Sequence, residues 1–496
     1  MPPPEIRLVK SNISLYLSLI IRLAVSVGFA IIVARKLDVN EFATIGLIMA
    51  FYTITQQLTT IWTFWAQRWT SRGEYKAVST GLVLSIFFAF LILPVYIAFS
   101  KLESWVLGIN ERLLYTGWAF VWISPILYYL TSIALVTTPS KVGILKGVYE
   151  TSRFIIAYLL VVTLRQGYSG AILALTIAAA VTTIGYFAIL ARSGIRAKGV
   201  DFKLARYWLG NWKIPLLYMI TRIMRLFNRP YISWVTGSST AVAYLNVAVA
   251  SETPLIMASN LTAMPMYSRI LRKPRTEDVE VSISLFLLFT GLLATIFIGA
   301  AKPIANLYNP DYLRASTALQ LVAIFAIVSG IANIIRQALL ALEQPEVNME
   351  KIEGGNLLYR TLKYATILII VPYLVAAPIV YITREDPASA VETFLSILIL
   401  FSLVQLALFG RWLTRMLEFK PPVQDILAVF AGSTLSILYL VLSGVNSQLY
   451  ARFWDQIKPL AIHSIVALAI YTIVIVALSP LARRIINRGL EEVKRW

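Results

Sequence analysis

The composition of this 496-residue chain is that of a membrane protein. Hydrophobic residues make up 58% of it and charged residues 14%, and its mean hydropathy is +0.74. Soluble domains are about 45–50% apolar and about 25% charged, so these values exclude a soluble enzyme, a disordered chain and a coiled coil. Cysteine is absent and histidine occurs once, at His463, which excludes disulfides, thiolate metal sites and multi-histidine metal centres.

The net charge of +19 comes from 44 Lys and Arg against 25 Asp and Glu. In a soluble protein such an excess favours nucleic-acid binding. Membrane proteins, however, collect positive charge in their cytoplasmic loops. We therefore expect no nucleic-acid partner.

Fourteen segments are long and apolar enough to cross a bilayer, which takes roughly 20 mostly apolar residues per helix. Backbone polar groups in lipid must be paired internally, so the predicted fold is an all-α polytopic membrane protein. Lys and Arg are far more frequent in the connections on the side of the N-terminus, which predicts a multi-pass cell-membrane protein with both termini cytoplasmic. The segments are 12–34, 42–65, 78–100, 115–138, 148–166, 169–191, 211–236, 241–267, 281–305, 316–342, 356–380, 388–410, 424–444 and 459–481.

Two segments about 200 residues apart share a pattern. Residues 33–50 read VARKLDVNEFATIGLIMA and residues 233–250 read SWVTGSSTAVAYLNVAVA. Each is a helix end, a short polar turn and a new helix rich in small residues. Such repeats are typical of transporters, whose binding site lies between the halves. The predicted parts are an N-terminal lobe of helices 1–6 (1–191), a basic cytoplasmic linker (192–210), a C-terminal lobe of helices 7–12 (211–410), and helices 13–14 with a cytoplasmic tail (411–496).

Charged residues inside the spans are the candidates for function, because a charge in lipid is costly and usually faces a cavity or a partner. Arg22 in helix 1 and Arg222 in helix 7 occupy equivalent depths in the two halves. On helix 7, a spacing of 100° per residue places four side chains on one narrow face. These four are Tyr218, Arg222, Arg225 and Arg229. Arg336 is a further arginine, in helix 10.

Arginine suits a diphosphate, because its planar fork donates two hydrogen bonds and keeps its charge. The arginines therefore predict a cationic cavity that binds a diphosphate headgroup. The alternative is that they extend to lipid headgroups or pair with buried acids.

Two further residues are candidates for the cavity. Glu252 in helix 8 is the clearest acid within a span; it either neutralises a helix 7 arginine or carries a coupling proton. Helix 2 has a polar stripe at Thr53, Gln57, Thr60 and Gln67. The stripe predicts hydrogen bonds between helices or, at Gln57, contact with the substrate.

The turn between helices 1 and 2 carries a resemblance to a known family. Ala34-Arg35-Lys36-Leu37 is followed by Asp38 and by Glu41-Phe42. This resembles the polysaccharide-biosynthesis membrane proteins, the lipid-linked oligosaccharide flippases of the multidrug/oligosaccharidyl-lipid/polysaccharide (MOP) exporter superfamily. Asp38 stands where a glycine is usual in that family, whereas Gly237 keeps the glycine in the second half. Two further segments resemble family motifs, Pro265 to Arg269 and Ala301 to Tyr312.

The resemblance implies fourteen helices in two pseudo-symmetric six-helix lobes plus helices 13–14, arranged as a V around a central cavity. It implies a monomer, not an enzyme, that moves a polyprenyl- or dolichyl-diphosphate oligosaccharide from the cytoplasmic to the outer leaflet by alternating access. Arg22 matches the arginine that the family places in helix 1. The expected partners are this substrate and membrane lipids, and no cofactor is expected.

Two alternatives remain open. A multidrug exporter of the same superfamily usually places acids in cavity helices to exchange with Na⁺ or H⁺, but helix 1 has no acid. A membrane glycosyltransferase or polymerase acting on lipid-linked sugars generally needs acids on the outer side, to bind metal or act as a base. Glu385-Asp386 is the only adjacent pair of acids expected there.

Overall fold

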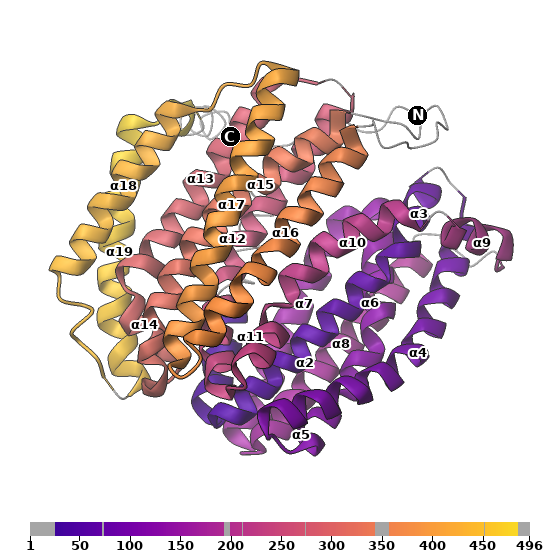
Figure 1. Cartoon of the computed structure of the whole chain (residues 1–496), viewed down its shortest axis with the longest axis horizontal. Helices are drawn as coiled ribbons and strands as arrows, with labels where there is room; N and C mark the ends of the chain where they lie inside the picture. The colour runs from indigo at the N-terminus through magenta and orange to yellow at the C-terminus, as the bar shows by residue number, and fades with distance from the viewer. Residues whose placement is uncertain are drawn as a thin grey trace. The chain divides into compact units, whose positions relative to one another are not determined.

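The chain is built from helices throughout the residues that its structure describes. The computed structural model describes residues 25–71, 74–192, 199–210, 212–272, 274–342, 357–450 and 452–484, and residues 25–36 form its first helix. Figure 1 shows the order of the helices that follow. They are α2 (Val39–Leu58), α3 (Thr60–Ser71), α4 (Lys76–Leu107), α5 (Glu111–Tyr115), α6 (Trp118–Thr137), α7 (Pro139–Ala157), η1 (Tyr158–Thr163), α8 (Gly167–Arg192), α9 (Phe202–Gly210), α10 (Lys213–Leu226), α11 (Asn228–Thr236), α12 (Ser239–Arg272), α13 (Thr276–Gly299), α14 (Ala301–Tyr308), η2 (Pro310–Ala315), α15 (Ser316–Leu342), α16 (Leu357–Ile382), α17 (Pro387–Leu417), α18 (Val423–Leu442) and α19 (Phe453–Leu478).

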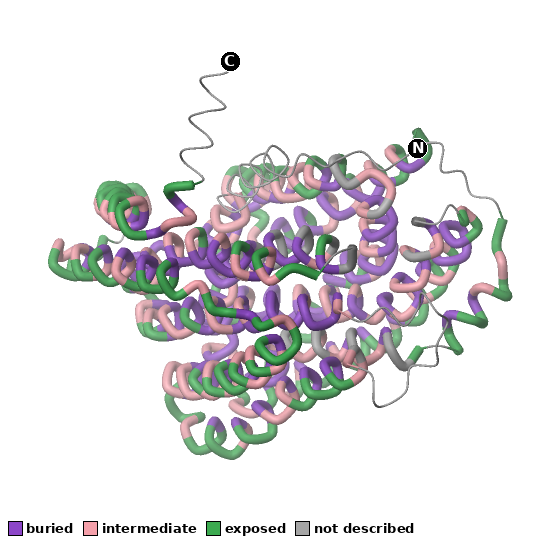
Figure 2. Tube along the Cα trace, turned by 90° about the horizontal axis from the view of Figure 1, so that it is seen from above, coloured by how far each residue is buried: buried purple, intermediate pink, exposed green. Residues whose placement is uncertain are grey.

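Nine helical segments of the described chain are long and apolar enough to cross a membrane. Several of these helices carry large apolar side chains that are exposed on their surface. Figure 2 shows where exposed residues lie along the chain. Phe87 and Phe90 on α4 are 61% and 57% exposed, and Phe430 on α18 is 71% exposed. Contiguous apolar surface of this kind is unfavourable in water and favourable in lipid. The chain is therefore a multi-pass all-α membrane protein, as its sequence predicts.

Several expected spans differ in detail from the structure. The second is divided at Thr59 into α2 and α3, and the seventh at Phe227 into α10 and α11. The fifth ends in a π-helical turn, η1, and the third extends to Leu107 rather than residue 100. Much of the first lies outside the described residues. The count of fourteen spans therefore remains a prediction.

Packing divides the chain into two compact units, Met1–Ala243 and Tyr244–Trp496. Within the first unit, α10 packs against α2 and α3, and α11 packs against α4 and α2. The two segments of the seventh span thus group with the N-terminal helices, whereas the sequence repeat assigns them to the second lobe. The lobe boundary drawn from the repeat remains a prediction, because it rests on sequence pattern rather than on packing.

Asp38 stands where the family that this turn resembles has a glycine, and in this structure it caps the start of α2. The Asp38 carboxylate accepts a hydrogen bond of 2.7 Å from the Glu41 backbone N–H. The Glu41 carboxylate in turn accepts from the Asp38 backbone N–H at 3.3 Å. This reciprocal capping box satisfies two of the unpaired donors at the start of α2.

The second half of the repeat makes the same turn with different residues. Gly237 ends α11 with a φ of 63°, a left-handed conformation that favours glycine. Ser238 then caps α12, its hydroxyl accepting from the Ala241 N–H at 3.2 Å. The acceptor Ser238 lies 200 positions after Asp38, and the donor Ala241 lies 200 positions after Glu41. The repeat read from sequence is thus present in the local hydrogen bonding.

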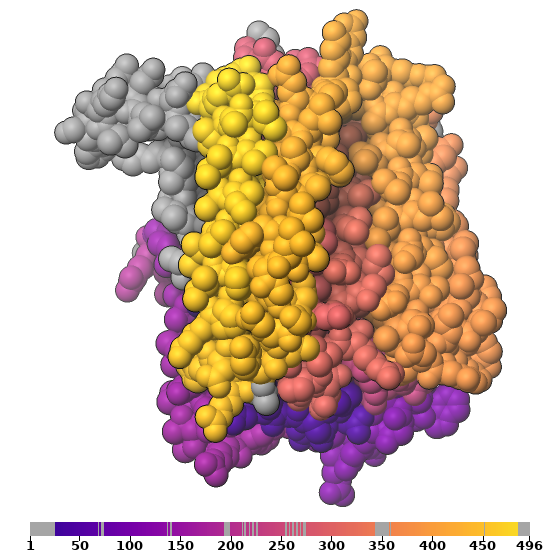
Figure 3. All heavy atoms as spheres, turned by 90° about the vertical axis from the view of Figure 1, so that its left-hand side faces the viewer, coloured from indigo at the N-terminus to yellow at the C-terminus, as the bar shows by residue number. Residues whose placement is uncertain are grey.

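A buried carboxylate joins the last two helices to α13 within the second unit. Asp425, at the start of α18, accepts hydrogen bonds from Ser284 of α13 at 2.8 Å and from Ser479, just after α19, at 2.6 Å. Farther along, Gly291 leaves room for Tyr471 of α19, whose hydroxyl donates to the Leu288 carbonyl at 2.9 Å. Figure 3 shows the α18–α19 pair in yellow, on the surface beside α13.

The absence of native cysteine allows the membrane orientation to be tested with single cysteines. We expect a membrane-impermeant maleimide added to intact cells to label a cysteine at Ser447 but not one at Val200. Both positions are exposed, and Val200 is preferred to Gly199 because Gly199 has a φ of 89°. Permeabilised cells serve as the control in which both label. Labelling at Val200 alone in intact cells would reverse the predicted orientation.

Candidate functional site

The seventh span is broken. It carries the expected cationic stripe of Tyr218, Arg222, Arg225 and Arg229. The Phe227 N–H is shared between the carbonyls of Ile223 and Met224, at 3.0 and 3.2 Å. Pro230 has no N–H to offer the Leu226 carbonyl four residues earlier, so one helical hydrogen bond is missing here. The next one, from the Tyr231 N–H to the Phe227 carbonyl, is present at 2.9 Å. A single continuous helix over 211–236 is therefore wrong. Interrupted helices are common where transporters bind substrate.

The break divides the expected stripe between two helices. Tyr218, Arg222 and Arg225 belong to α10, and Arg229 belongs to α11. The side chains of the first three lie outside the described residues, as does the whole of Arg22. Arg229 is half-buried. The cationic cavity thus remains a prediction, with three of its residues placed on one short helix.

A buried acid holds α11 in place. Glu103, near the end of α4, has no exposed surface. Its carboxylate accepts from the Ser233 hydroxyl at 2.6 Å and from the Trp234 indole N–H at 2.8 Å. The third expected span ends at residue 100 and leaves Glu103 in the loop that follows. α4 continues past Glu103 to Leu107, and the carboxylate is buried against α11.

The polar stripe of helix 2 is largely occupied by neighbouring helices. The Thr60 hydroxyl lies 3.3 Å from that of Tyr128, and the Gln67 side-chain amide donates to the Ser132 carbonyl at 3.0 Å. Both partners belong to α6, which confirms the expected hydrogen bonds between helices. Gln57 is buried, and its side-chain carbonyl has no hydrogen-bond partner among the described residues. The Gln57 side-chain carbonyl is therefore a buried acceptor that a ligand could use.

The two remaining candidates are buried in the second unit. Glu252 on α12 is 5% exposed and Arg336 on α15 is 6% exposed. Arg336 donates a hydrogen bond of 2.6 Å to the Asn333 side-chain carbonyl, one turn earlier on the same helix. Charges at such depth are expensive in a membrane protein and mark functional or structural sites.

A buried ion pair in the first unit was missed by sequence reasoning. Arg153 on α7 is 5% exposed and lies 2.5 Å from the Glu150 carboxylate, one turn earlier. The same guanidinium nitrogen donates to Ser26 of the first helix at 2.9 Å, and the guanidinium stacks on Phe29 at 4.4 Å. The pair therefore connects the first helix to α7. The three-residue spacing of Glu150 and Arg153 was a signal for it, but their position near the expected start of a span made them look like loop charges.

Metal binding receives no support from the described part of the chain. No group of three or more His, Cys, Asp or Glu side chains gathers there in a way that could hold an ion.

Comparisons with known proteins give the fold. No family model and no curated protein matches this chain. The solved structure of the lipid II flippase MurJ in an inward closed conformation matches with a TM-score of 0.66 at 13% identity, over 94% of this chain and 99% of the flippase. An inward-facing multidrug resistance transporter of the MATE family, in the MOP superfamily, matches with a TM-score of 0.58 at 12% identity, over 80% and 98%. A mutant of the Vibrio cholerae MATE transporter VcmN matches with a TM-score of 0.56 at 18% identity, over 82% and 98%.

The chain shares the fold of these solved flippase and MATE structures. The expected resemblance is confirmed at the level of the fold. The flippase matches almost the whole of this chain, whereas the MATE structures leave about a fifth of it unmatched. At identities of 12–18% the likeness concerns the fold and assigns no substrate.

Proposed function

We propose that this protein is a flippase that moves a polyprenyl- or dolichyl-diphosphate oligosaccharide from the cytoplasmic to the outer leaflet. The observation that carries the proposal is the match in fold to a lipid flippase over nearly the full length of both chains. The cationic residues of helices 1 and 7 point to the same function, because fixed guanidinium groups suit a diphosphate.

In this proposal the two lobes alternate access to a central cavity. Arg22, Arg222, Arg225 and Arg229 hold the diphosphate through charge-assisted hydrogen bonds. Tyr218 and Gln57 add polar contacts, and Glu252 and Arg336 tune the charge of the second lobe. The lipid tail stays in the bilayer while the headgroup crosses, so no covalent bond changes. The broken seventh span supplies the short helices that such sites use.

A multidrug exporter is the second candidate, because the MATE structures share this fold. The extent of the match favours the flippase, which covers 94% of this chain against 80–82% for the MATE structures. The absence of an acid from residues 12–34 also argues against an ion-exchanging helix 1.

A transport assay separates the candidates. Liposomes containing the purified protein are loaded with polyprenyl-diphosphate oligosaccharides extracted from its own membranes. We expect glycans of the inner leaflet to become accessible to an external lectin at least tenfold faster than in protein-free liposomes, with substrate mass unchanged. Efflux of a cationic dye without glycan movement would support the exporter instead.

The enzyme alternative makes a different prediction in the same assay. A transferase or polymerase would change the mass of the substrate, and Glu385→Gln or Asp386→Asn would abolish that change. The flippase requires neither carboxylate. Asp386 also caps α17, accepting from the Ala388 N–H at 3.4 Å, and asparagine retains this capping ability.

A further inference from the structure

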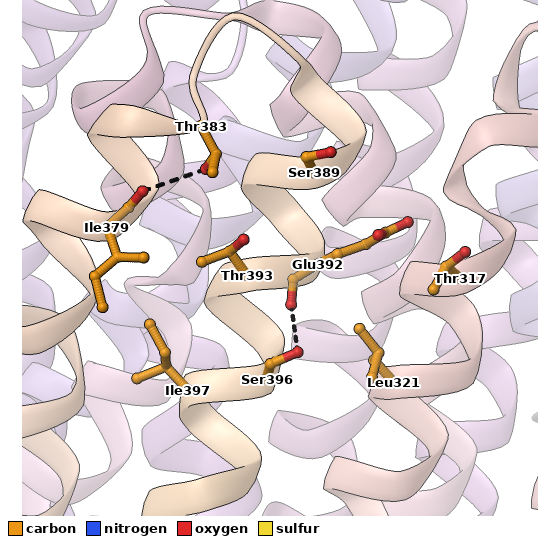
Figure 4. A pocket seen from close by; sticks show the side chains of 9 residues that line it. All are labelled: Thr317, Leu321, Ile379, Thr383, Ser389, Glu392, Thr393, Ser396 and Ile397. Carbon is orange, nitrogen blue, oxygen red and sulfur yellow. Dashed lines mark hydrogen bonds between the residues drawn. The ribbon is translucent and has the colours of Figure 1, made fainter.

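A pocket outside the predicted diphosphate site lies within the second unit. It has a volume of about 660 Å³ and opens between the ends of α15, α16 and α17 (Figure 4). This volume is in the range of small-molecule sites, roughly 300–1,000 Å³. The turn that joins α16 to α17 borders it, and the predicted topology places this turn on the outer side. The lining residues are Thr317, Leu321, Ile379, Thr383, Ser389, Glu392, Thr393, Ser396 and Ile397.

One face of α17 supplies most of the polar groups. Ser389, Glu392, Thr393 and Ser396 follow a spacing of three, four and seven residues, which places them on one side of the helix. The helix is otherwise apolar enough to span a membrane. A polar face on such a helix is unfavourable against lipid, so its position in a pocket calls for a polar occupant.

Three of the lining groups have hydrogen-bonding capacity to spare. The carboxylate of Glu392 and the hydroxyls of Thr317 and Thr393 make no hydrogen bond or ion pair within the described part of the chain. Figure 4 shows the Glu392 side chain extending from α17 toward Thr317 of α15. The hydroxyls of Thr383 and Ser396 donate to carbonyls of their own helices, at 3.2 and 2.8 Å, and keep lone pairs for an incoming donor.

The charge of the lining residues is unfavourable for a diphosphate. No Lys or Arg lines it, and Glu392 contributes a carboxylate. At its rim, the Ser389 hydroxyl donates to Asp386 at 2.6 Å, and this hydrogen bond lowers the pKa of the Asp386 carboxyl below its ordinary value. Asp386 therefore stays ionised at neutral pH. An anion would meet repulsion here, whereas a molecule rich in hydroxyl groups could donate to the carboxylate and exchange hydrogen bonds with the threonines.

We propose that this pocket binds an uncharged sugar unit of the transported glycan, through Glu392, Thr393 and Thr317. The apolar side chains of Leu321, Ile379 and Ile397 would pack against the carbon face of the ring. The inference rests on the proposed function for the identity of its ligand. It adds a glycan subsite to a protein whose predicted cationic residues recognise only the diphosphate.

The test compares lipids with and without the glycan. Binding of polyprenyl diphosphate, and of the polyprenyl-diphosphate oligosaccharides from the protein's own membranes, is measured on the full chain in lipid nanodiscs. We expect the Glu392→Gln, Thr393→Val double variant to bind the glycan-bearing lipid about tenfold more weakly and the bare lipid unchanged. Glu385→Gln is the matched control, because Glu385 lies on the neighbouring turn, exposed and outside the lining.

Other outcomes overturn the inference in recognisable ways. Equal weakening for both lipids, or no change for either, would reject a glycan subsite. If sodium strengthens the binding of both lipids to the wild type equally, and the double variant loses this sodium effect, the pocket is a cation site instead. If the wild type binds neither lipid, the proposed flippase function fails. The free oligosaccharide, followed by saturation-transfer NMR, then decides the subsite alone: a signal lost in the double variant supports it, and no signal from the wild type rejects it.

Discussion

Arg222→Ala is expected to weaken binding of the diphospholipid about ten- to a hundredfold. A hydrogen bond to a charged group is worth about 1.5–3 kcal/mol, and about 1.4 kcal/mol corresponds to a factor of ten in affinity. Arg222 lies on α10, one turn before the break at Phe227 in the seventh span. The measurement is the dissociation constant of polyprenyl diphosphate in nanodiscs. Arg22→Ala should have a similar effect if both halves contribute.

Lysine substitution is the informative control. Arg222→Lys should restore only part of the affinity, because an ammonium group keeps the charge but lacks the bidentate fork. The alternative, in which Arg222 serves only to neutralise Glu252, predicts a loss of thermal stability that a second change, Glu252→Gln, repairs. Unchanged lipid affinity with stability restored in the double variant would reject substrate binding by Arg222.

Glu150→Ala is expected to lower the free energy of unfolding by about 3–5 kcal/mol, the usual cost of leaving one member of a buried ion pair without its partner. Arg153 would keep its position against Phe29 and its hydrogen bond to Ser26, but its charge would be uncompensated at 5% exposure. The measurement is unfolding of the purified protein in detergent. The first helix should become sensitive to proteolysis before the other helices, because Arg153 holds it through its contacts with Ser26 and Phe29.

Two further variants test whether the loss of stability comes from the uncompensated buried charge of Arg153. The double variant Glu150→Ala, Arg153→Met should recover most of the lost stability, since replacing both members of a buried pair by apolar groups is often neutral. Arg269→Ala breaks the 2.8 Å pair with Asp278, in which the arginine side chain is 54% exposed, and should cost about 1 kcal/mol or less. Equal effects of Glu150→Ala and Arg269→Ala would show that burial does not strengthen the Glu150–Arg153 pair.

The candidate sites of substrate contact could be predicted only in part from sequence. Charge inside a span is visible in the sequence, so the cationic residues of helix 7 could be identified and placed on one face. That placement assumed one unbroken helix. The break at Phe227 instead divides the four residues between α10 and α11. The pocket between α15, α16 and α17 was not anticipated, because its lining combines one glutamate with serines, threonines and aliphatic residues that are unremarkable until three helix ends bring them together.

The amino-acid sequence by itself determined the membrane class, most of the helical segments and the repeat. These depend on hydropathy, helical periodicity and turn residues, which act over a few positions of chain: Asp38 and Glu41 form their capping box within one turn. Only the tertiary structure decided which helix faces meet. Ser26 and Arg153 are 127 residues apart, and Glu103 and Ser233 are 130 residues apart. In both pairs a buried charge finds its partner on another helix. The physical reason is that the composition of a span shows that its charge must be compensated, whereas the packing of distant helices determines which group compensates it.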